Sequence, residues 1–362
     1  MLIPTDEFWR DKRIFLTGHT GFKGTWLASW LVKLGANVFG LSLAPDTNPS
    51  LSELVDIERR VTSVRQDIRD GGALRQSMQQ FAPDIVLHLA AQALVQRAYD
   101  EPVLTYETNV MGTVHVLEAV RRTPSVRVVV VVTSDKCYEN REWCWGYREV
   151  DHLGGYDPYS SSKACAELVT SAWRRSFLSK SEDGRHVAVA TARAGNVIGG
   201  GDWATDRLIP DCIRALSDGR PVPVRNPGAM RPWQHVLDPL CGYLLLAERL
   251  WWDGNETADA WNFGPSINEV TPVSYIVERM VALWGDGGSY ELANDTRPHE
   301  AGLLALDASK ARLRLGWRPR LGIEEALSWT AQWYKRQFLG APATMLVDED
   351  IDRFERLATE HR

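Results

Sequence analysis

The sequence predicts an α/β fold with a doubly wound parallel sheet and a smaller C-terminal α/β domain. Short apolar runs alternate with helical patterns through the first half of the chain, as in strands joined by crossover helices. Residues 126–133 (VRVVVVVT) are almost continuously apolar, which is typical of a strand buried on both faces. Glycine and proline become frequent after Asn196, where we place the start of the second domain.

The elements of the first domain, residues 1–195, follow from hydrophobic spacing. We expect strands at residues 13–17, 37–43, 61–67, 84–89, 126–133 and 186–193. Helices are expected at residues 24–34, 72–81, 105–122 and 160–178. The second domain, residues 196–362, binds the substrate in this interpretation; it need not be continuous, and later segments can rejoin the first domain.

Composition limits the function classes. A chain of 362 residues corresponds to about two domains, and its net charge of −6 does not provide the basic surface that nucleic acids require. No apolar run approaches the ~20 residues of a membrane span, and the N-terminus lacks the apolar stretch of a secretion signal. We therefore expect a cytoplasmic protein. The five cysteines form no CxxC pair, so we expect neither a disulfide framework nor a metal site.

A glycine turn, residues 17–24 (TGHTGFKG), joins the first strand to the first helix. Its spacing, GxxGxxG, lets backbone amides approach a pyrophosphate at a helix N-terminus. This position predicts a Rossmann-type dinucleotide site. The second strand ends without an acid for a ribose or an arginine for a 2′-phosphate, so it does not distinguish NAD from NADP. Asp67 and Ile68 either contact adenine, or Asp67 is a helix cap or a surface acid.

A tyrosine and a lysine four residues apart, Tyr159 and Lys163, begin a predicted helix and share one face of it. An ammonium beside a phenol, or a nearby nicotinamide cation, favours the phenolate, so the tyrosine is a candidate base. Ser134, Asp135 and Lys136 follow a strand at the sheet edge where ligands bind. The alternatives are a solvated Tyr–Lys pair, a simple Asp135–Lys136 ion pair, and Ser134 as a turn cap.

These motifs, taken in order, resemble those of the extended short-chain dehydrogenase/reductases. Further matching segments are residues 88–92 (HLAAQ), Asn109 in a helix, residues 133–138 (TSDKCY), 193–203 (RAGNVIGGGDW), 231–238 (RPWQHVLD) and 297–317 (RPHEAGLLALDASKARLRLGW). The resemblance covers nearly the whole chain. Residues 133–140 (TSDKCYEN) and 195–203 (GNVIGGGDW) are most similar to the sugar-nucleotide dehydratases that act on CDP-glucose.

The resemblance implies a hydro-lyase that converts CDP-glucose to CDP-4-keto-6-deoxyglucose with a tightly bound NAD regenerated in each turnover. It implies that Tyr159 takes the 4-hydroxyl proton, Ser134 holds the 4-oxygen and Lys163 lowers the tyrosine pKa. Asp135 would protonate the departing 6-hydroxyl. Many such dehydratases carry Asp-Glu where this chain has Asp135-Lys136, so Lys136 is either a neutral C5 base or a cation that stabilises the enolate.

The resemblance also implies the binding residues. The cofactor set is Gly18, Thr20, Gly21, Phe22, Lys23, Gly24, Asp67, Ile68, Leu89, Ala90, Ala91, Gln92, Asn109, Thr133, Tyr159 and Lys163. The substrate set is Asn196, Trp203, Arg207, Arg231, Arg297 and His299. Arg231 and Arg297 are the candidates for the diphosphate, because guanidinium groups suit bidentate phosphate contacts; each could instead be a surface arginine. His88 either packs under the cofactor or is a core histidine with satisfied hydrogen bonds.

Three other functions share parts of this pattern: a nucleotide-sugar 4-epimerase, a dehydratase for another NDP-hexose, and a non-catalytic NAD(P)-sensing protein. The first keeps the glycine turn and the Tyr–Lys pair but has no need of an acid at Asp135. A non-catalytic NAD(P)-sensing protein does not need Tyr159, Lys163 and Ser134, so the presence of all three argues against it. The resemblance further implies a homodimer or homotetramer that pairs through the helices at 105–122 and 160–178, and no membrane or nucleic-acid partner.

Overall fold

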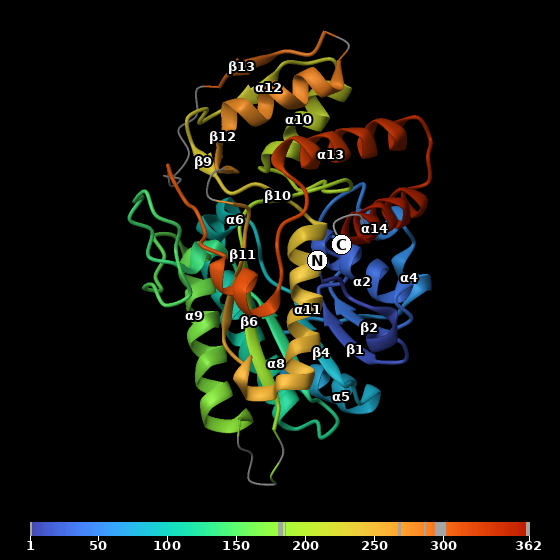
Figure 1. The fold of residues 1–362 in the computed structure, drawn as a ribbon, viewed down its shortest axis with the longest axis vertical. Helices are drawn as coiled ribbons and strands as arrows, with labels where there is room; N and C mark the ends of the chain where they lie inside the picture. Colours follow the sequence, from blue (N-terminus) through green and yellow to red (C-terminus); the bar gives the residue numbers. More distant parts are fainter. Residues whose placement is uncertain are drawn as a thin grey trace.

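The structure is a computed structural model that describes residues 2–179, 184, 186–266, 269–285, 287–293 and 302–359. Its central layer is a parallel sheet (Figure 1). Within the described residues its strands are, in spatial order, β11 (Ala260–Phe263), β6 (Ala188–Ala194), β5 (Val128–Val132), β4 (Ile85–His88), β1 (Arg13–Thr17), β2 (Asn37–Ser42) and β3 (Thr62–Arg65). This is the doubly wound order in which the carboxyl ends of all strands meet at one edge.

Helices cover both faces of the sheet, and each face has its own apolar core. On one face lie α2 (Phe22–Lys33) and α11 (Leu237–Asp253), which bury Trp26, Trp30 and Leu244. On the other lie α5 (Gly71–Phe81) and α8 (Gly112–Arg121), which pack against Phe15 and Val129. Because β5 is covered on both faces, all five of its valines are buried, and the prediction of a doubly covered sheet is confirmed.

All six predicted strands exist, and their ends differ from the predictions by at most two residues. The helix predicted at 105–122 is instead α7 (Pro102–Tyr106), a π-helical turn η1 (Glu107–Met111) and α8. The helix predicted at 160–178 begins earlier as α9 (Pro158–Trp173) and continues as π-helical η3 (Arg174–Leu178). Asp157 explains the early start of α9, since its side chain accepts from the Ser160 amide ahead of a proline at the first helical position.

Several elements that follow residue 196 form the upper part of the molecule in Figure 1, beyond the carboxyl edge of the sheet. They are α10 (Leu208–Ser217), α12 (Val273–Trp284), α13 (Ile323–Phe338) and the strand pairs β7 (Val197–Ile198) with β10 (Gln234–His235), β8 (Val222–Val224) with β13 (Tyr290–Leu292), and β9 (Met230–Arg231) with β12 (Thr271–Pro272). Two later elements, α11 and β11, return to the first sheet. The division of the chain at residue 196 stays a prediction.

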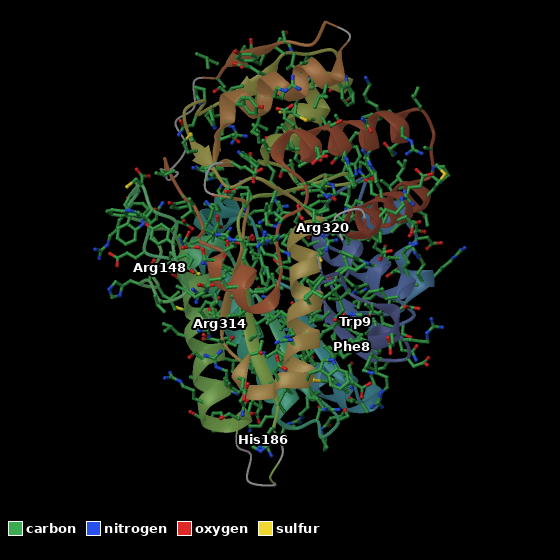
Figure 2. The ribbon with its side chains drawn as sticks, viewed as in Figure 1. Phe8, Trp9, Arg148, His186, Arg314 and Arg320 are labelled. Atoms are coloured by element: carbon green, nitrogen blue, oxygen red, sulfur yellow. The ribbon has the colours of Figure 1, made fainter. Side chains whose placement is uncertain are left out.

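Short elements and a final helix complete the described fold. They are α1 (Asp6–Trp9), α3 (Leu51–Leu54), α4 (Ile57–Arg60), α6 (Val95–Asp100), η2 (Asp135–Cys137), η4 (Gly254–Glu256), η6 (Ala311–Leu315) and α14 (Ala343–Thr359). Figure 2 shows Phe8 and Trp9 of α1 beside α11, where the Trp9 Nε1 donates to Glu248 over 2.7 Å. Throughout the described chain, every helix is too short or too polar to cross a membrane.

Candidate active site

The glycine turn brings two backbone segments into close contact. Gly18 has a φ of +80°, and a Cβ on it would lie 2.7 Å from the amide nitrogen of Ala90. A Cβ on Gly24 would lie 1.9 Å from the carbonyl oxygen of Gly18, so only glycine fits there. Gly21 is the N-cap of α2 and has no side chain to cap it. The first-turn amides of α2 are therefore available to an anion such as a pyrophosphate.

The segment after β5 places an acid in a buried position. Ser134 begins the turn η2; its Oγ accepts from the amide of Lys136 (3.2 Å) and donates to Oδ1 of Asp135 (3.0 Å). The Oδ2 of Asp135 is buried without a hydrogen-bond partner, and a Cβ on Gly195 would lie 3.0 Å from it. Burial raises the pKa of Asp135 above its usual value, although the Lys136 charge opposes the shift. A carboxyl that holds its proton more tightly is suited to act as a general acid.

Tyr159 and Lys163 lie on the first turns of α9, both buried. The Lys163 ammonium donates to the carbonyl oxygen of Val132 at the end of β5 (3.4 Å), and burial lowers its pKa to about 8. Burial raises the pKa of Tyr159 to about 12, and a hydrogen bond with Ser134 opposes the shift. The expectation that the tyrosine pKa is lowered is thus wrong for the protein alone, because burial of the phenol outweighs its polar contacts.

The charged groups of four elements converge at this edge. Burial, with the charges of Arg207 and Lys163, lowers the pKa of Lys23 on α2 to about 8, and Asp135 and Asp202 oppose the shift. Arg207 precedes α10, forms a 3.0 Å ion pair with Asp202 and interacts electrostatically with Tyr159. The sequence-predicted residues Lys23, Asp135, Lys163 and Arg207 are therefore neighbours in the structure.

Arg231 approaches the same site from β9. It is buried, its Nη1 donates to the carbonyl oxygens of Met230 (3.0 Å) and Gly302 (3.3 Å), and its charge acts on Asp135. Trp203 packs edge-to-face on Tyr334, with ring centroids 5.2 Å apart, and the backbone carbonyl oxygen of Asn196 accepts from the amide of Gln234. Arg297 and His299 lie outside the described residues.

Asn109 of η1 links the turn after β4 to α9. Its Oδ1 accepts from the amide of Gln92 (2.8 Å), while its Nδ2 donates to the Gln92 carbonyl oxygen (3.0 Å) and to Ser162 Oγ (2.9 Å). Asn109 therefore ties α9, the helix that carries Tyr159 and Lys163, to the segment that follows β4. π-helical turns such as η1 are frequent at functional sites.

The contacts of His88 and Asp67 bear on two alternatives left open by the sequence, while a contact of Asp67 with adenine stays a prediction. His88 lies between Thr17 Oγ1 (2.7 Å) and Thr113 Oγ1 (3.1 Å), so its interpretation as a satisfied core histidine is confirmed. Asp67 accepts from the amide and guanidinium of Arg69, and Asp70 is the N-cap of α5 instead, so the helix-cap interpretation of Asp67 is wrong. The remaining cofactor assignments, Thr20, Phe22, Ile68, Leu89, Ala90, Ala91 and Thr133 among them, stay predictions.

Sequence reasoning missed a buried ion pair behind the segments predicted to be catalytic. Glu167 on α9 and Arg193 on β6 are each 3% exposed and lie 2.8 Å apart. One signal was available: Glu167 follows Lys163 by four residues, so a helix that buries the lysine also buries the glutamate.

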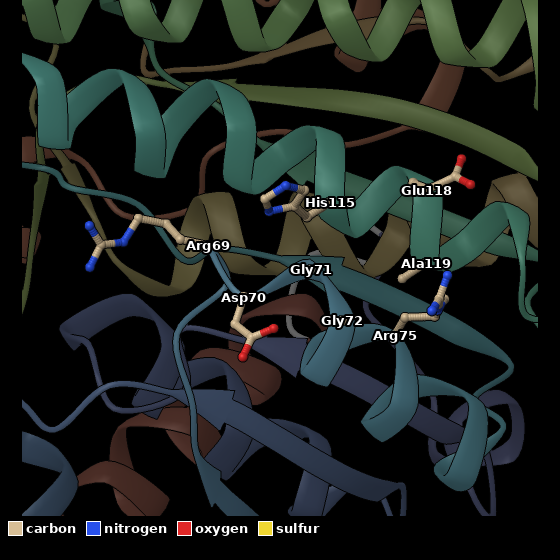
Figure 3. Close-up of a pocket in the computed structure, with 8 residues that line it drawn as sticks. All are labelled: Arg69, Asp70, Gly71, Gly72, Arg75, His115, Glu118 and Ala119. Atoms are coloured by element: carbon tan, nitrogen blue, oxygen red, sulfur yellow. The ribbon is translucent and has the colours of Figure 1, made fainter.

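A separate cavity of about 440 Å³ lies between α5 and α8 (Figure 3). It is lined by Arg69, Asp70, Gly71, Gly72, Arg75, His115, Glu118 and Ala119, none of which belongs to the catalytic set. Within the described ranges, no group of three or more histidine, cysteine or acidic side chains is placed to hold a metal ion.

The doubly wound sheet, the glycine turn and the Tyr159–Lys163 pair beside Ser134 define a protein of the extended short-chain dehydrogenase/reductase class. Residues 15–330 match the model of the GDP-mannose 4,6 dehydratase family, and the chain belongs to that family.

Individual relatives extend the comparison. The chain is 50% identical over 354 residues to the CDP-glucose 4,6-dehydratase of Salmonella typhimurium, covering 98% of this chain and 99% of that protein. It is 28% identical over 348 residues to the dTDP-glucose 4,6-dehydratase of Neisseria gonorrhoeae, covering 89% and 95%.

Among solved structures, the dTDP-glucose 4,6-dehydratase of Streptomyces venezuelae with NAD and TYD bound has a TM-score of 0.74 at 26% identity, covering 91% of this chain and 99% of that one. The UDP-glucose 4-epimerase of Thermotoga maritima has a TM-score of 0.78 at 23% identity, covering 90% and 99%, and shares the fold.

Proposed function

We propose that this protein is a CDP-glucose 4,6-dehydratase, which converts CDP-glucose to CDP-4-keto-6-deoxyglucose and water. The observation that carries the proposal is the buried, unpartnered Oδ2 of Asp135, which lies in one site with Ser134 and Tyr159. An epimerase needs a base and a cofactor at C4 but no proton donor for a leaving hydroxyl. The 50% identity to the Salmonella protein favours CDP as the nucleotide.

The site fits a dinucleotide. The Gly18–Gly24 contact closes the turn tightly, and the open amides of α2 suit a pyrophosphate. The cofactor set predicted from the sequence would hold it, with Lys163 on the ribose. NAD is the dinucleotide bound in the similar Streptomyces dehydratase. When bound, it would supply a reversible acceptor for the hydrogen of C4, which returns to C6, so that no cofactor is consumed.

The chain's own residues would carry the proton transfers. Tyr159 takes the 4-hydroxyl proton, and Ser134, which hydrogen-bonds the tyrosine, also holds the 4-oxygen. The buried tyrosine has a pKa of about 12, so a positive charge beside it, that of the oxidised nicotinamide, is needed to favour the phenolate near neutral pH. Asp135, with its raised pKa, gives a proton to the 6-hydroxyl as water leaves.

Lys136 has two possible roles at C5. As a neutral amine it would remove the C5 proton; as a cation it would stabilise the enolate while another group takes that proton. Solvent-deuterium exchange at C5 tests the role of Lys136 as the base, with Lys136→Met as the variant. Full exchange in that variant removes Lys136 from the role, whereas loss of exchange is expected for the base and for the cation alike.

The diphosphate of the substrate would meet a local cluster of cations. Arg207 and Arg231 converge near Asp135 and Tyr159 in a protein of net charge −6. The global field does not attract an anionic substrate, so these placed guanidinium groups must do so. Arg297 is assigned to the diphosphate and His299 to the substrate from their motif, Asn196 would contact the phosphate or a nearby backbone group, and Trp203 would wall the nucleotide pocket.

The test incubates the purified protein separately with CDP-, dTDP-, UDP- and GDP-glucose and follows the products by mass spectrometry. A 4-keto-6-deoxy product from CDP-glucose, lighter by one water, supports the proposal. An isomer of unchanged mass would identify an epimerase, and turnover of another nucleotide sugar in place of CDP-glucose would identify a different dehydratase.

We also propose that the protein is a homodimer or homotetramer that pairs through α7, η1 and α9. These elements expose Val103, Tyr106, Met111 and Leu168, which are between 38% and 69% accessible. Apolar side chains gathered on neighbouring helices are typical of a protein interface. Analytical ultracentrifugation of the wild type and of Leu168→Glu tests this: the charged variant should shift the equilibrium towards monomer.

A further inference from the structure

A buried ion pair stands behind the catalytic segments, and stability alone does not explain it. Glu167 and Arg193 are each 3% exposed. Removing two charges from water costs free energy that their mutual attraction often fails to recover, so a buried pair is weak evidence of a stabilising role. The hydrogen bonds of this pair lead to the turn after β5, and the charge of Glu167 acts on Lys163.

The two oxygens of the Glu167 carboxylate contact different elements. Oε1 accepts from the hydroxyl of Thr133, the residue between β5 and Ser134. Oε2 accepts from Thr191 Oγ1 of β6 (2.7 Å) and from Arg193 Nη2 (2.8 Å). Arg193 Nη1 in turn donates to the hydroxyl of Tyr138 over 2.7 Å. The pair therefore holds residues 133 and 138, the two ends of the turn that carries Ser134, Asp135 and Lys136.

The charge of Glu167 acts on Lys163, one helical turn earlier on α9. Burial lowers the pKa of Lys163, and Glu167 is the larger of the two influences that oppose this, ahead of the Cys137 thiol on η2. The Lys163 charge also faces His88 on β4 and Lys23 on α2. Although burial of Glu167 opposes its ionisation, Arg193 holds the pKa of this carboxyl below its usual value, so the negative charge persists.

We propose that Glu167 is a positioning residue for the reaction. Its carboxylate holds the Ser134–Lys136 turn against the helix that carries Tyr159, and its negative charge keeps the Lys163 ammonium charged. The kinetic part of this inference rests on the proposed dehydratase function, whereas the charge state of Lys163 does not depend on it.

The test variant is Glu167→Gln, with Thr191→Val as the matched control. Glutamine has the same shape and retains hydrogen-bonding groups towards Thr133 and Arg193, but it carries no charge. Valine at position 191 removes one neutral hydrogen bond to the same carboxylate and leaves its charge in place. Any effect seen in the first variant and not in the second therefore reports the charge of Glu167.

Two measurements are made on each protein. The titration of Lys163 is followed by NMR of protein labelled with ¹³C-lysine, assigned with Lys163→Arg, and the pH dependence of kcat is measured with CDP-glucose. Loss of a nearby opposite charge should lower the Lys163 pKa by about one unit or more. The alkaline loss of kcat should begin about one pH unit lower, which from a starting pKa of about 8 is roughly a five-fold deficit at pH 8.

The proposal is overturned if Glu167→Gln leaves the Lys163 titration unchanged, or if Thr191→Val shifts it equally. Should the single variant fail to fold, as an unpaired buried arginine can cause, Glu167→Gln combined with Arg193→Met removes both charges and must still lower the Lys163 pKa. Wild-type protein that turns over no nucleotide sugar would refute the proposed function, while the NMR titration would still decide the role of Glu167.

Discussion

The buried acid offers the sharpest mechanistic prediction. Asparagine at position 135 has nearly the shape of aspartate, and its oxygen can accept the Ser134 hydrogen bond that Oδ1 accepts now (3.0 Å). Its amide would occupy the place of Oδ2, which has no partner among the described residues, so the fold should be retained. What Asp135→Asn removes is the proton that the raised pKa of this carboxyl keeps available.

The expected loss of dehydration rate follows from the role of Asp135 as a general acid. Proton transfer by a positioned side chain contributes about 10²- to 10⁴-fold, or roughly 3–5 kcal/mol of transition-state stabilisation. Dehydration of CDP-glucose by Asp135→Asn should fall by that factor. Oxidation at C4 precedes loss of the 6-hydroxyl and uses Tyr159, so it should fall much less, and reduced cofactor should accumulate during a single turnover.

Stopped-flow absorbance of the reduced nicotinamide, with quenched samples analysed by mass spectrometry, measures both steps. Circular dichroism and a thermal melt serve as the control for folding. Dehydration within about five-fold of wild type would refute the role of Asp135, since five-fold lies well below the range for general acid catalysis. Equal loss of C4 oxidation would refute its restriction to the elimination step.

Three further outcomes are expected. Gly24→Ala should abolish NAD binding, because the alanine Cβ would lie 1.9 Å from the Gly18 carbonyl oxygen. Isothermal titration calorimetry measures the binding, and an affinity equal to that of wild type would contradict this account of the turn. Arg231→Gln should raise the KM for CDP-glucose about 10- to 100-fold, as loss of a charged phosphate contact worth roughly 1.5–3 kcal/mol requires, and an unchanged KM would discard Arg231. Burial lowers the pKa of His235 to about 3. As pH falls from 6.5 towards 3, the free energy of unfolding of wild type should therefore drop relative to that of His235→Leu, by up to about 1.4 kcal/mol per pH unit. Denaturant midpoints of the two proteins that change in parallel across that range would contradict this prediction.

The sign of the last effect follows from linkage. In the unfolded chain His235 binds a proton near pH 6.5, whereas the folded protein keeps it neutral until about pH 3. Below pH 6.5 the unfolded state therefore binds more protons than the folded state, and acid favours unfolding. Leucine at this position binds none and removes the difference.

Local sequence patterns predicted most of the strands and helices. β5 is five consecutive valines, a pattern typical of a strand covered on both faces, and the GxxGxxG turn lies where a strand meets a helix. We expected that later segments could rejoin the first domain, but the sequence did not identify β11 as one of them, because residues 260–263 are a short apolar run within irregular sequence. The π-helical turns η1 and η3 contain no proline or glycine themselves, and only η1 has a glycine, Gly112, directly after it.

The site was predicted by residue type but not by environment. The spacing of Tyr159 and Lys163 showed that they share a helix face, yet the pKa of Tyr159 depends on burial that forms only when α9, β5 and the later half of the chain meet. The same holds for the unpartnered oxygen of Asp135. Glu167 and Arg193 are 26 residues apart in sequence and pair only through the packing of α9 on β6.

The central claim, that one site oxidises C4, eliminates water across C5 and C6 and returns the same hydrogen to C6, is tested most directly by isotope transfer. The protein is incubated with CDP-glucose carrying deuterium at C4, and the product is analysed by NMR. The account predicts deuterium at C6 of a 4-keto-6-deoxy sugar. Deuterium that stays at C4 of an isomer, or is lost to solvent, would contradict it.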